Sequence, residues 1–187
     1  LIILSFFLFV GVGIINFCNF MDGIDGLLAG TMLVIFTSIL ISTDFNNYTL
    51  IGSLIAFLIF NWSPSKLFMG DIGSYFLGAL YVNQIYIANS FEASFAILLF
   101  SFPLIADCFF TLLRRLFLKQ NIFSAHNLHL YQRLSKGKYG HSPISTLYII
   151  FTTFIVLSYF IGGIKYEIIA CLFTLYIGFL ADKYFAK

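Results

Sequence analysis

A succession of apolar runs constrains this chain more than any other feature. Seven runs are separated by short polar breaks, and a helix needs about 20 apolar residues to cross a bilayer. The runs cover residues 1–17, 27–41, 48–62, 72–88, 93–113, 144–161 and 168–180. Lipid offers backbone groups no partner, and these runs are apolar on all sides, so each is expected to be a helix. We expect an all-α polytopic membrane bundle of about seven transmembrane helices, forming one domain over residues 1–187.

The composition supports this interpretation. Hydrophobic residues make up 60% of the chain and charged residues 10%, against about 45–50% and 25% in soluble domains. The three cysteines lie in apolar stretches without a CxxC spacing, so we expect small buried side chains and no disulfide framework. The chain begins inside an apolar run and shows no signal peptide. We expect its natural N-terminus to lie upstream.

The positions of the basic residues indicate an orientation. Alternation of the spans puts the breaks 43–47, 89–92 and 162–165 on one side. The other side carries 16–25, 63–71, 114–141 and the C-terminus. Nine of the ten Lys and Arg residues lie on this second side: Lys66, Arg114, Arg115, Lys119, Arg133, Lys136, Lys138, Lys183 and Lys187. Because basic residues favour the cytoplasmic side, the second side is predicted to face the cytoplasm.

The first candidate motif is NFCNFMDGIDGLLAG at residues 16–30. Acids and amides at membrane depth are costly and usually functional. In a helix, Asp22 and Asp25 would share a face and could hold a hard cation or bind a ligand's hydroxyls or base edge. The alternative is a turn in which the acids cap helices and the glycines permit bends. For the motif as a whole, the pattern favours function.

The second motif is NWSPSKLFMGDIGS at residues 61–74. Asp71 stands where a helix is expected to begin, so it is either an N-cap or a ligand of Mg²⁺, which favours one or two carboxylates plus substrate phosphates. Phe68, an aromatic ring in a loop, could stack on a nucleobase or anchor the loop at the membrane interface.

The third motif, AHNLHLYQRL, belongs to the loop 114–141, which has six basic residues and no acid. Such a loop attracts anionic lipid heads or phosphorylated ligands. For its lysines, the pattern favours charges that set the membrane orientation and contact lipid. For His126, His129 and Arg133 the pattern favours function, since Arg binds phosphate in bidentate fashion and His can donate to a diphosphate or shuttle protons. No third ligand lies near enough in sequence for zinc. Asp107, in the preceding apolar run, requires either a partner or a role.

In this order, NFMDGIDG, FMGDIGS, PLIADCFFTLLRR and HNLHLYQRL resemble the polyprenyl-phosphate N-acetylhexosamine-1-phosphate transferases of glycosyltransferase family 4. The resemblance extends from about Asn16 to His141. It implies transfer of a GlcNAc-like sugar-1-phosphate from a UDP-sugar to undecaprenyl phosphate, with release of UMP. This reaction initiates cell-surface polysaccharides such as O-antigen or teichoic acid. The implied cofactor is Mg²⁺, with Mn²⁺ as the alternative.

The resemblance also implies roles for individual residues. Asp71 would bind the metal, and Phe68 would stack on uracil. The implied catalytic residues are Asp22, Asp25, Asp71, His126 and His129. The implied substrate-binding residues are Asn16, Asn19, Asn61, Phe68 and Arg133. The implied partners are a UDP-N-acetyl sugar, undecaprenyl phosphate and the membrane, without nucleic acid and with a homodimer left open. The implied location is the bacterial inner membrane, multi-pass, with the site on the cytoplasmic face.

Two departures from the family pattern refine this expectation. The peptidoglycan branch carries adjacent histidines, whereas the pattern here is His126-x-x-His129-x-x-Gln132-Arg133, closer to the branch that uses UDP-GlcNAc or related sugars. The family also has further spans and an Asp-Asp pair upstream, and no such pair occurs here. The chain is therefore expected to be the C-terminal portion of the family fold.

Three other functions share features with this sequence. A phospho-MurNAc-pentapeptide transferase of peptidoglycan synthesis would share the motifs. A non-catalytic remnant or scaffold would account for the missing upstream motif. A small transporter or channel would place ionisable groups near the bilayer midplane, whereas nearly all the acids here lie at predicted span ends.

Overall fold

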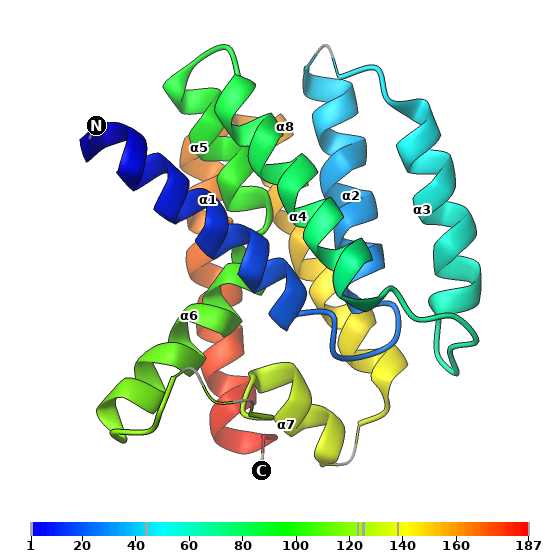
Figure 1. Ribbon diagram of the computed structural model, residues 1–187, viewed down its shortest axis with the longest axis vertical. Coiled ribbons are helices and arrows are strands. Elements are labelled where there is room, and N and C mark those ends of the chain that lie inside the picture. Colours follow the sequence, from blue (N-terminus) through cyan, green and yellow to red (C-terminus); the bar gives the residue numbers. More distant parts are fainter. Residues whose placement is uncertain (1, 44, 123, 125, 138, 187) are drawn as a thin grey trace.

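The computed structural model describes residues 2–43, 45–122, 124, 126–137 and 139–186 (Figure 1). This part of the chain is helical and contains no strand, which confirms the all-α prediction. In chain order the helices are α1 (Ile2–Phe20), α2 (Leu27–Ser42), α3 (Tyr48–Asn61), α4 (Gly70–Ile87), α5 (Phe91–Phe100), α6 (Phe102–Phe117), α7 (Leu130–Lys136) and α8 (His141–Tyr184). Lys138 and Lys187, which the charge argument used, lie outside the described residues.

Helix α2 forms the centre of the bundle. It packs against α3, α4, α5 and α8, and its side chains Leu27, Leu28, Met32 and Phe36 are completely buried. A sequence that is apolar around its whole circumference suits a helix surrounded by others. Helix α1 lies along α4 on the other flank of the bundle and also touches α6 (Figure 1). These two packings bring the end of α1 and the start of α2 close to the start of α4.

The predicted span 93–113 is wrong as a single helix. The chain breaks at Ser101, and α5 and α6 are bent by 73° relative to each other. Pro103 in the first turn of α6 explains the new start, because proline lacks an amide hydrogen and suits the beginning of a helix. The Tyr81 hydroxyl lies 2.9 Å from the Ser101 hydroxyl and 2.5 Å from the Ile97 carbonyl, which supplies polar partners at the break.

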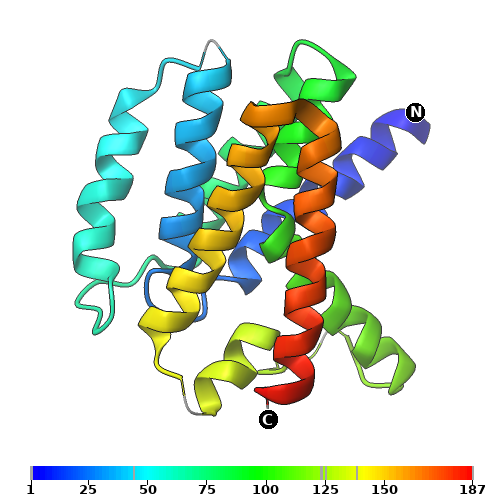
Figure 2. The same cartoon turned by 180° about the vertical axis from the view of Figure 1, so that it is seen from behind.

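The last two predicted spans, 144–161 and 168–180, are the two arms of α8. Non-helical dihedral angles at Gly162 and Gly163 separate the arms, and Gly163 has a φ of 68°, a conformation that favours glycine. Figure 2 shows the second arm running back alongside the first. The sequence did not predict α7, a helix of 7 residues within the basic loop.

The connections gather at two ends of the bundle. Residues 45–47, the loop 88–90 and the turn of α8 lie at one end (Figures 1 and 2). The loops 21–26 and 62–69, together with α7, lie at the other. This arrangement agrees with the predicted alternation and collects the candidate residues at one end.

The number of membrane spans stays a prediction. By length and composition, α8 is the one helix in the described part of the chain that could cross a membrane, and the bent pair α5–α6 adds a second if it counts as one span. Shorter apolar helices lie at Ser5–Phe20, Leu27–Ser42 and Tyr48–Asn61.

Candidate active site

The first motif forms a tight loop rather than a continued helix. α1 ends at Phe20, and residues 21–26 form turns and bends. Asp22 and Asp25 therefore do not share a face of a helix, as they would if α1 continued. Two glycines allow close packing of this loop. A Cβ on Gly23 would lie 1.9 Å from the Tyr131 hydroxyl, and one on Gly26 would lie 2.7 Å from the Trp62 ring. The loop is therefore held between α7 and the second motif.

Asn19 joins the first and second motifs directly. Its side-chain amide donates to Asp71 Oδ1 at 3.0 Å and to the Ser74 hydroxyl at 2.9 Å. Asp71 lies in the first turn of α4, where the N-cap is Met69, so the N-cap interpretation of Asp71 is wrong. A carboxylate near a helix N-terminus is stabilised by the exposed amides and the helix dipole. The predicted metal ligand and a predicted sugar-site amide are thus in direct contact.

Asp22 lies close enough to Asp71 for the charge of Asp71 to act on its carboxyl. Burial, together with the smaller effect of the negative charge of Asp71, raises the pKa of the Asp22 carboxyl to about 7. A negative charge near a partly buried carboxyl disfavours the ionised form of that carboxyl, and shifted pKa values of this kind are frequent at catalytic and cation-binding sites. Asp22 can therefore exchange a proton near neutral pH.

Asp25 is held in a different environment. It accepts hydrogen bonds from the Ser65 hydroxyl at 2.8 Å and the Ser65 amide at 3.3 Å, and its Oδ2 lies 3.1 Å from His141 Nδ1. That nitrogen is also 3.5 Å from the Asp25 amide nitrogen, and the shorter contact favours a proton on Nδ1. Burial acts to raise the Asp25 pKa, but the hydrogen bonds from Ser65 and His141 outweigh it and hold the pKa below its usual value.

Asn61 and Phe68, two predicted substrate-binding residues of the second motif, differ in their surroundings. Asn61 is buried, accepts from the Gly26 amide at 3.0 Å and donates to the Leu67 carbonyl at 2.8 Å. Its amide therefore ties two loops together. The Phe68 ring is 75% exposed, which leaves its face free for stacking. Asn16, on α1, donates to the Val12 carbonyl of its own helix at 2.7 Å.

Asp107 anchors the third motif. Its carboxylate accepts from the amides of Leu130 and Tyr131 at 2.7 and 3.2 Å and from the Tyr148 hydroxyl at 2.7 Å. It thereby satisfies amides at the N-terminus of α7, which would otherwise lack partners. The question that the sequence left open for Asp107 has a structural answer, since this buried acid joins α6, α7 and α8.

The two histidines of the third motif lie together at the start of α7. Their ring centroids are 4.9 Å apart, and the buried His129 also lies near Phe20, with a centroid distance of 6.1 Å. His129 Nδ1 is 3.6 Å from Asp107. Burial, together with the smaller effects of the nearby His129 and Arg115, lowers the pKa of His126 to about 4. His126 is therefore neutral at pH 7 and suits hydrogen bonding better than charge pairing.

Arg133 points toward the last helix. Its Nε donates to the Leu128 carbonyl at 3.1 Å, and its terminal nitrogen binds Asp182 on α8. The structure thus brings Asn19, Asp22 and Asp71 into one cluster and places Arg133 in an ion pair elsewhere on α7.

Several contributors were not predicted from sequence. Tyr131 donates from its hydroxyl to the Phe20 carbonyl at 2.9 Å, and Ser145 donates to the Asp25 carbonyl at 2.7 Å. These residues hold the loop 21–26 in place. Ser74, which follows Asp71 by three positions in FMGDIGS, had a detectable signal, because residues at this spacing share a helix face. Tyr131 and Ser145 had none, since their partners lie far away in sequence.

The donor set bears on which metal could bind here. Within the described residues, no cluster of three or more His, Cys, Asp or Glu side chains is placed to hold a metal ion. Asp22 and Asp71 together supply two carboxylates. This set fits Mg²⁺, which is commonly bound by one or two carboxylates and completes its coordination with water and substrate phosphates.

Fold and site together define an all-helical protein that gathers carboxylates, amides and histidines on the loops at one end. Comparison with known proteins specifies the class. The model of glycosyl transferase family 4 matches residues 1–89. An undecaprenyl-phosphate alpha-N-acetylglucosaminyl 1-phosphate transferase of Thermotoga maritima is 34% identical over 131 residues, which cover 70% of this chain and 43% of that protein.

Two further relatives represent both branches. A probable undecaprenyl-phosphate N-acetylglucosaminyl 1-phosphate transferase of Bacillus subtilis is 34% identical over 143 residues, covering 70% of this chain and 40% of the relative. A phospho-N-acetylmuramoyl-pentapeptide-transferase of Latilactobacillus sakei is 47% identical over 75 residues, covering 36% and 23%. The chain belongs to glycosyl transferase family 4, as its motifs predicted. It spans less than half the length of these relatives.

Proposed function

We propose that this chain forms the nucleotide-sugar end of a membrane enzyme that transfers an N-acetylhexosamine-1-phosphate, GlcNAc-like, from a UDP-sugar to undecaprenyl phosphate. UMP is the second product. The hydrogen bond between Asn19 and Asp71 carries this proposal, because it joins two motifs whose residues are 52 positions apart. The charge of Asp71 also acts on Asp22 of the first motif. Relatives named for this transfer match most of the chain.

The reaction suits the residues. An oxygen of the acceptor phosphate would attack the phosphorus that bears the sugar, and the bond from that phosphorus to the oxygen of UMP would break. Phosphoryl transfer of this kind depends mainly on positioning and on neutralisation of negative charge. A Mg²⁺ ion, with Mn²⁺ as a substitute, would neutralise phosphate charge when bound by Asp71 and Asp22. Because its pKa lies near 7, Asp22 can also hold or release a proton there.

Substrate recognition divides among the other motifs. The exposed Phe68 ring would stack on uracil, a contact worth about 1–3 kcal/mol. Neutral His126 would donate a hydrogen bond to the diphosphate or the sugar. Asn61 and Asp25 would act indirectly by holding the loops in place. Arg133 would reach the diphosphate only after exchanging its Asp182 partner.

The membrane arrangement follows from the same proposal. The end that carries the site would face the cytoplasm of a bacterium, since among the described basic residues only Lys165 lies toward the turn of α8. The two arms of α8, the bent pair α5–α6 and the helices α1 to α4 would supply the seven spans. The short helices would then cross with their ends near the polar headgroups.

A transfer assay tests the function. Radiolabelled UDP-GlcNAc and undecaprenyl phosphate are incubated in detergent with this chain, alone and within the full reading frame that contains it, with and without Mg²⁺. We expect a lipid-linked product that requires Mg²⁺. Asp71→Asn should lower turnover by at least about 100-fold, as expected for loss of a group that stabilises transition-state charge.

The control is Glu92→Gln, which removes an exposed acid at the opposite end of the bundle and should leave turnover unchanged. UDP-MurNAc-pentapeptide serves as the alternative donor, and preference for it would assign the chain to the peptidoglycan branch. Near-normal turnover of Asp71→Asn would remove the metal assignment. Absence of product with every donor, under conditions in which the Thermotoga maritima relative is active, would favour a scaffold.

A further inference from the structure

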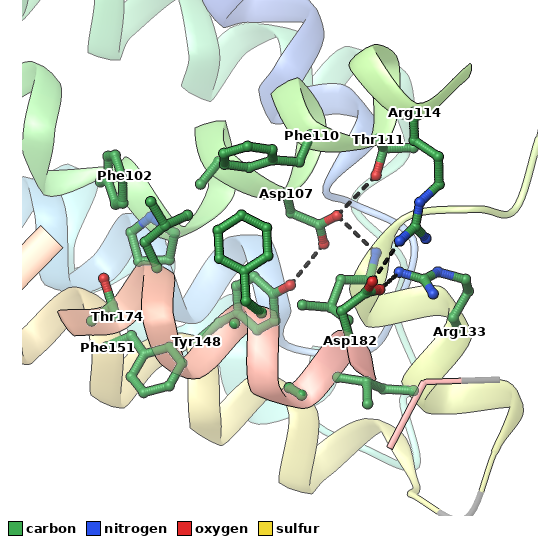
Figure 3. A pocket seen from close by; sticks show the side chains of 18 of the residues that line it. Phe102, Asp107, Phe110, Thr111, Arg114, Arg133, Tyr148, Phe151, Thr174 and Asp182 are labelled. Atoms are coloured by element: carbon green, nitrogen blue, oxygen red, sulfur yellow. Dashed lines mark hydrogen bonds and ion pairs between the residues drawn. The ribbon is translucent and has the colours of Figure 1, made fainter. Parts of the chain in front are cut away.

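A groove runs between α6 and the second arm of α8 (Figure 3). Two arginines in its lining, Arg114 and Arg133, both bind the carboxylate of Asp182. The Asp107 carboxylate in the same lining accepts from the Tyr148 hydroxyl and from the amides at the start of α7. Each charged side chain of the groove thus has a partner, and its exposed apolar side chains suit contact with a bilayer.

A cavity of about 600 Å³ lies at the end of the bundle opposite to the candidate active site. It is bounded by the end of α2, by residues 45–47 and by the connection from α4 to α5. Its volume lies within the roughly 300–1,000 Å³ that is usual for ligand sites. Four of its lining residues carry primary amides, namely Asn46, Asn47, Gln84 and Asn89. The described lining residues carry no charge, and Asp44 of the same loop lies outside the described residues.

Gln84 is the buried amide of this cavity. It belongs to α4, within an apolar run, and only 5% of its surface is exposed. In the described part of the chain its side-chain amide makes no hydrogen bond. Buried amides normally have a partner, and polar side chains at membrane depth are costly. Because Gln84 lines the cavity, its donors and its acceptor are available to a ligand there.

The other three amides of the lining also have unused hydrogen-bonding capacity. Asn46 and Asn89 are exposed, and neither makes a side-chain hydrogen bond within the described residues. Asn47 accepts from the Leu50 amide at 3.0 Å through Oδ1, which leaves its Nδ2 donors available. The cavity therefore offers several donors and acceptors of neutral charge that come from two separate segments of the chain.

We propose that this cavity binds a neutral sugar ring. Each hydroxyl of a sugar both donates and accepts, as a primary amide does. A charged ligand would exchange water for uncharged amides, and an acyl chain would leave the Gln84 amide without a partner. Phe45, which is partly buried and lies 6.0 Å from Phe36 between ring centroids, adds an apolar surface for the C–H face of the sugar.

The sugar ring is either a free saccharide or the headgroup of a glycolipid, since both present the same hydroxyls. The cavity is separate from Asp22, Asp25 and Asp71, none of which lines it. Binding there goes beyond the transfer reaction and does not depend on it.

Saturation-transfer NMR with maltose tests the proposal. The full chain is held in micelles of lauryldimethylamine oxide, because the headgroup of this detergent is not a sugar. We expect saturable binding of maltose. Dodecyl maltoside, which carries the same disaccharide on an alkyl chain, is then added as a competitor. Displacement of maltose at an about tenfold lower concentration than by free maltose would identify a glycolipid headgroup, and displacement at equal concentration would identify a free saccharide.

Side-chain variants locate the binding. Gln84→Leu removes the buried amide at similar volume and should weaken maltose binding by about tenfold. Asn83→Leu is the matched control, because Asn83 is the exposed neighbour on α4 and does not line the cavity. Asn89→Ala changes an exposed residue outside the core, so it should fold normally and weaken binding by about threefold.

Three outcomes would overturn the proposal. Absence of saturable maltose binding up to about 10 mM would remove the sugar site. Unchanged binding in both Gln84→Leu and Asn89→Ala would place the sugar elsewhere. Binding of triglycine as tightly as maltose, with the same sensitivity to both variants, would make the cavity a peptide site. Since the assay contains neither UDP-sugar nor Mg²⁺, failure of the transferase proposal would leave this result unaffected.

Discussion

Asp22 and Asp25 lie three residues apart in one loop, yet their carboxylates have opposite environments. Asp25 accepts two hydrogen bonds from Ser65 and faces His141, and these contacts lower its pKa. In the described part of the chain no group donates a hydrogen bond to the Asp22 carboxylate, and burial and Asp71 raise its pKa to about 7. These different surroundings make Asp25 an acid that stabilises the loops and leave Asp22 available for chemistry.

The largest expected effect is on turnover. In the enzyme that we propose, Asp22→Asn should lower kcat by about 10²–10³-fold, because the site loses a carboxylate that would neutralise or hold charge during transfer. Asp25→Asn should lower kcat by less than about tenfold, since its carboxylate is committed to Ser65 and His141. The measurement is initial-rate transfer with saturating UDP-sugar. Equal losses of kcat in the two variants would contradict the different roles assigned to Asp22 and Asp25.

The second effect is on the pH dependence of stability. The folded-state pKa of Asp22, about 7, lies above its unfolded value. The folded state therefore binds more protons between about pH 4 and 7, and stability falls as the pH rises through this window. Asp22→Asn should remove this decline and raise the free energy of unfolding at pH 8 by on the order of 2 kcal/mol, after allowance for partial exposure.

Unfolding by SDS titration in mixed micelles at pH 5 and pH 8 provides the measurement. Asp71→Asn is the informative companion, because removal of that charge should lower the pKa of Asp22 and shift the decline to lower pH. An Asp22→Asn variant with the parent's pH dependence would contradict the assignment of the raised pKa.

The third effect is also on the pH dependence of stability, but Asp25 changes it in the opposite direction from Asp22. The pKa of Asp25 is lowered by folding, so its contribution to stability is present above its ordinary pKa and is lost as the pH falls through the folded value. Asp25→Asn should cost about 1–2 kcal/mol at pH 7. A double-mutant cycle with His141→Gln should show coupling between the two residues. Strictly additive losses would mean that their contact does not stabilise the fold.

The smallest expected effect belongs to Ser65→Ala. It removes the 2.8 Å hydroxyl bond to Asp25 and retains the backbone bond, so a loss of about 1 kcal/mol is expected. Ser63→Ala, two residues earlier in the same loop, is the matched control. The same unfolding assay at pH 7 measures both variants, and indistinguishable values would show that the backbone bond alone holds Asp25.

Much of the fold could be predicted because helix formation in this chain is a local matter. Hydrophobic runs marked α1 to α4 and both arms of α8, since a continuous apolar stretch between polar breaks has few other solutions. The break at Ser101 was missed, although Pro103 was visible, because proline also occurs within helices that merely kink. Helix α7 was missed because Asp107 stabilises its start from another helix.

For the candidate site, the sequence motifs proposed individual residues but not how these residues are arranged. Motif order singled out Asn19, Asp22 and Asp71, which the structure brings together. The motif could not separate Asp22 from Asp25, because both acids stand before a glycine. Nor could it show that Arg133 pairs with Asp182, since residues 49 positions apart meet only after the helices have packed.

By itself, the sequence determined α1 to α4 and the two arms of α8, their alternation between two ends and the end at which the polar motifs gather. These properties depend on hydrophobicity and charge along short segments. Tertiary structure alone decided which acid is paired and which remains free. The partners of Asp25 are supplied by Ser65 and His141, which lie 40 and 116 residues away. A carboxylate's pKa is set by the groups within a few ångströms of it, and only packing of the helices determines which groups those are.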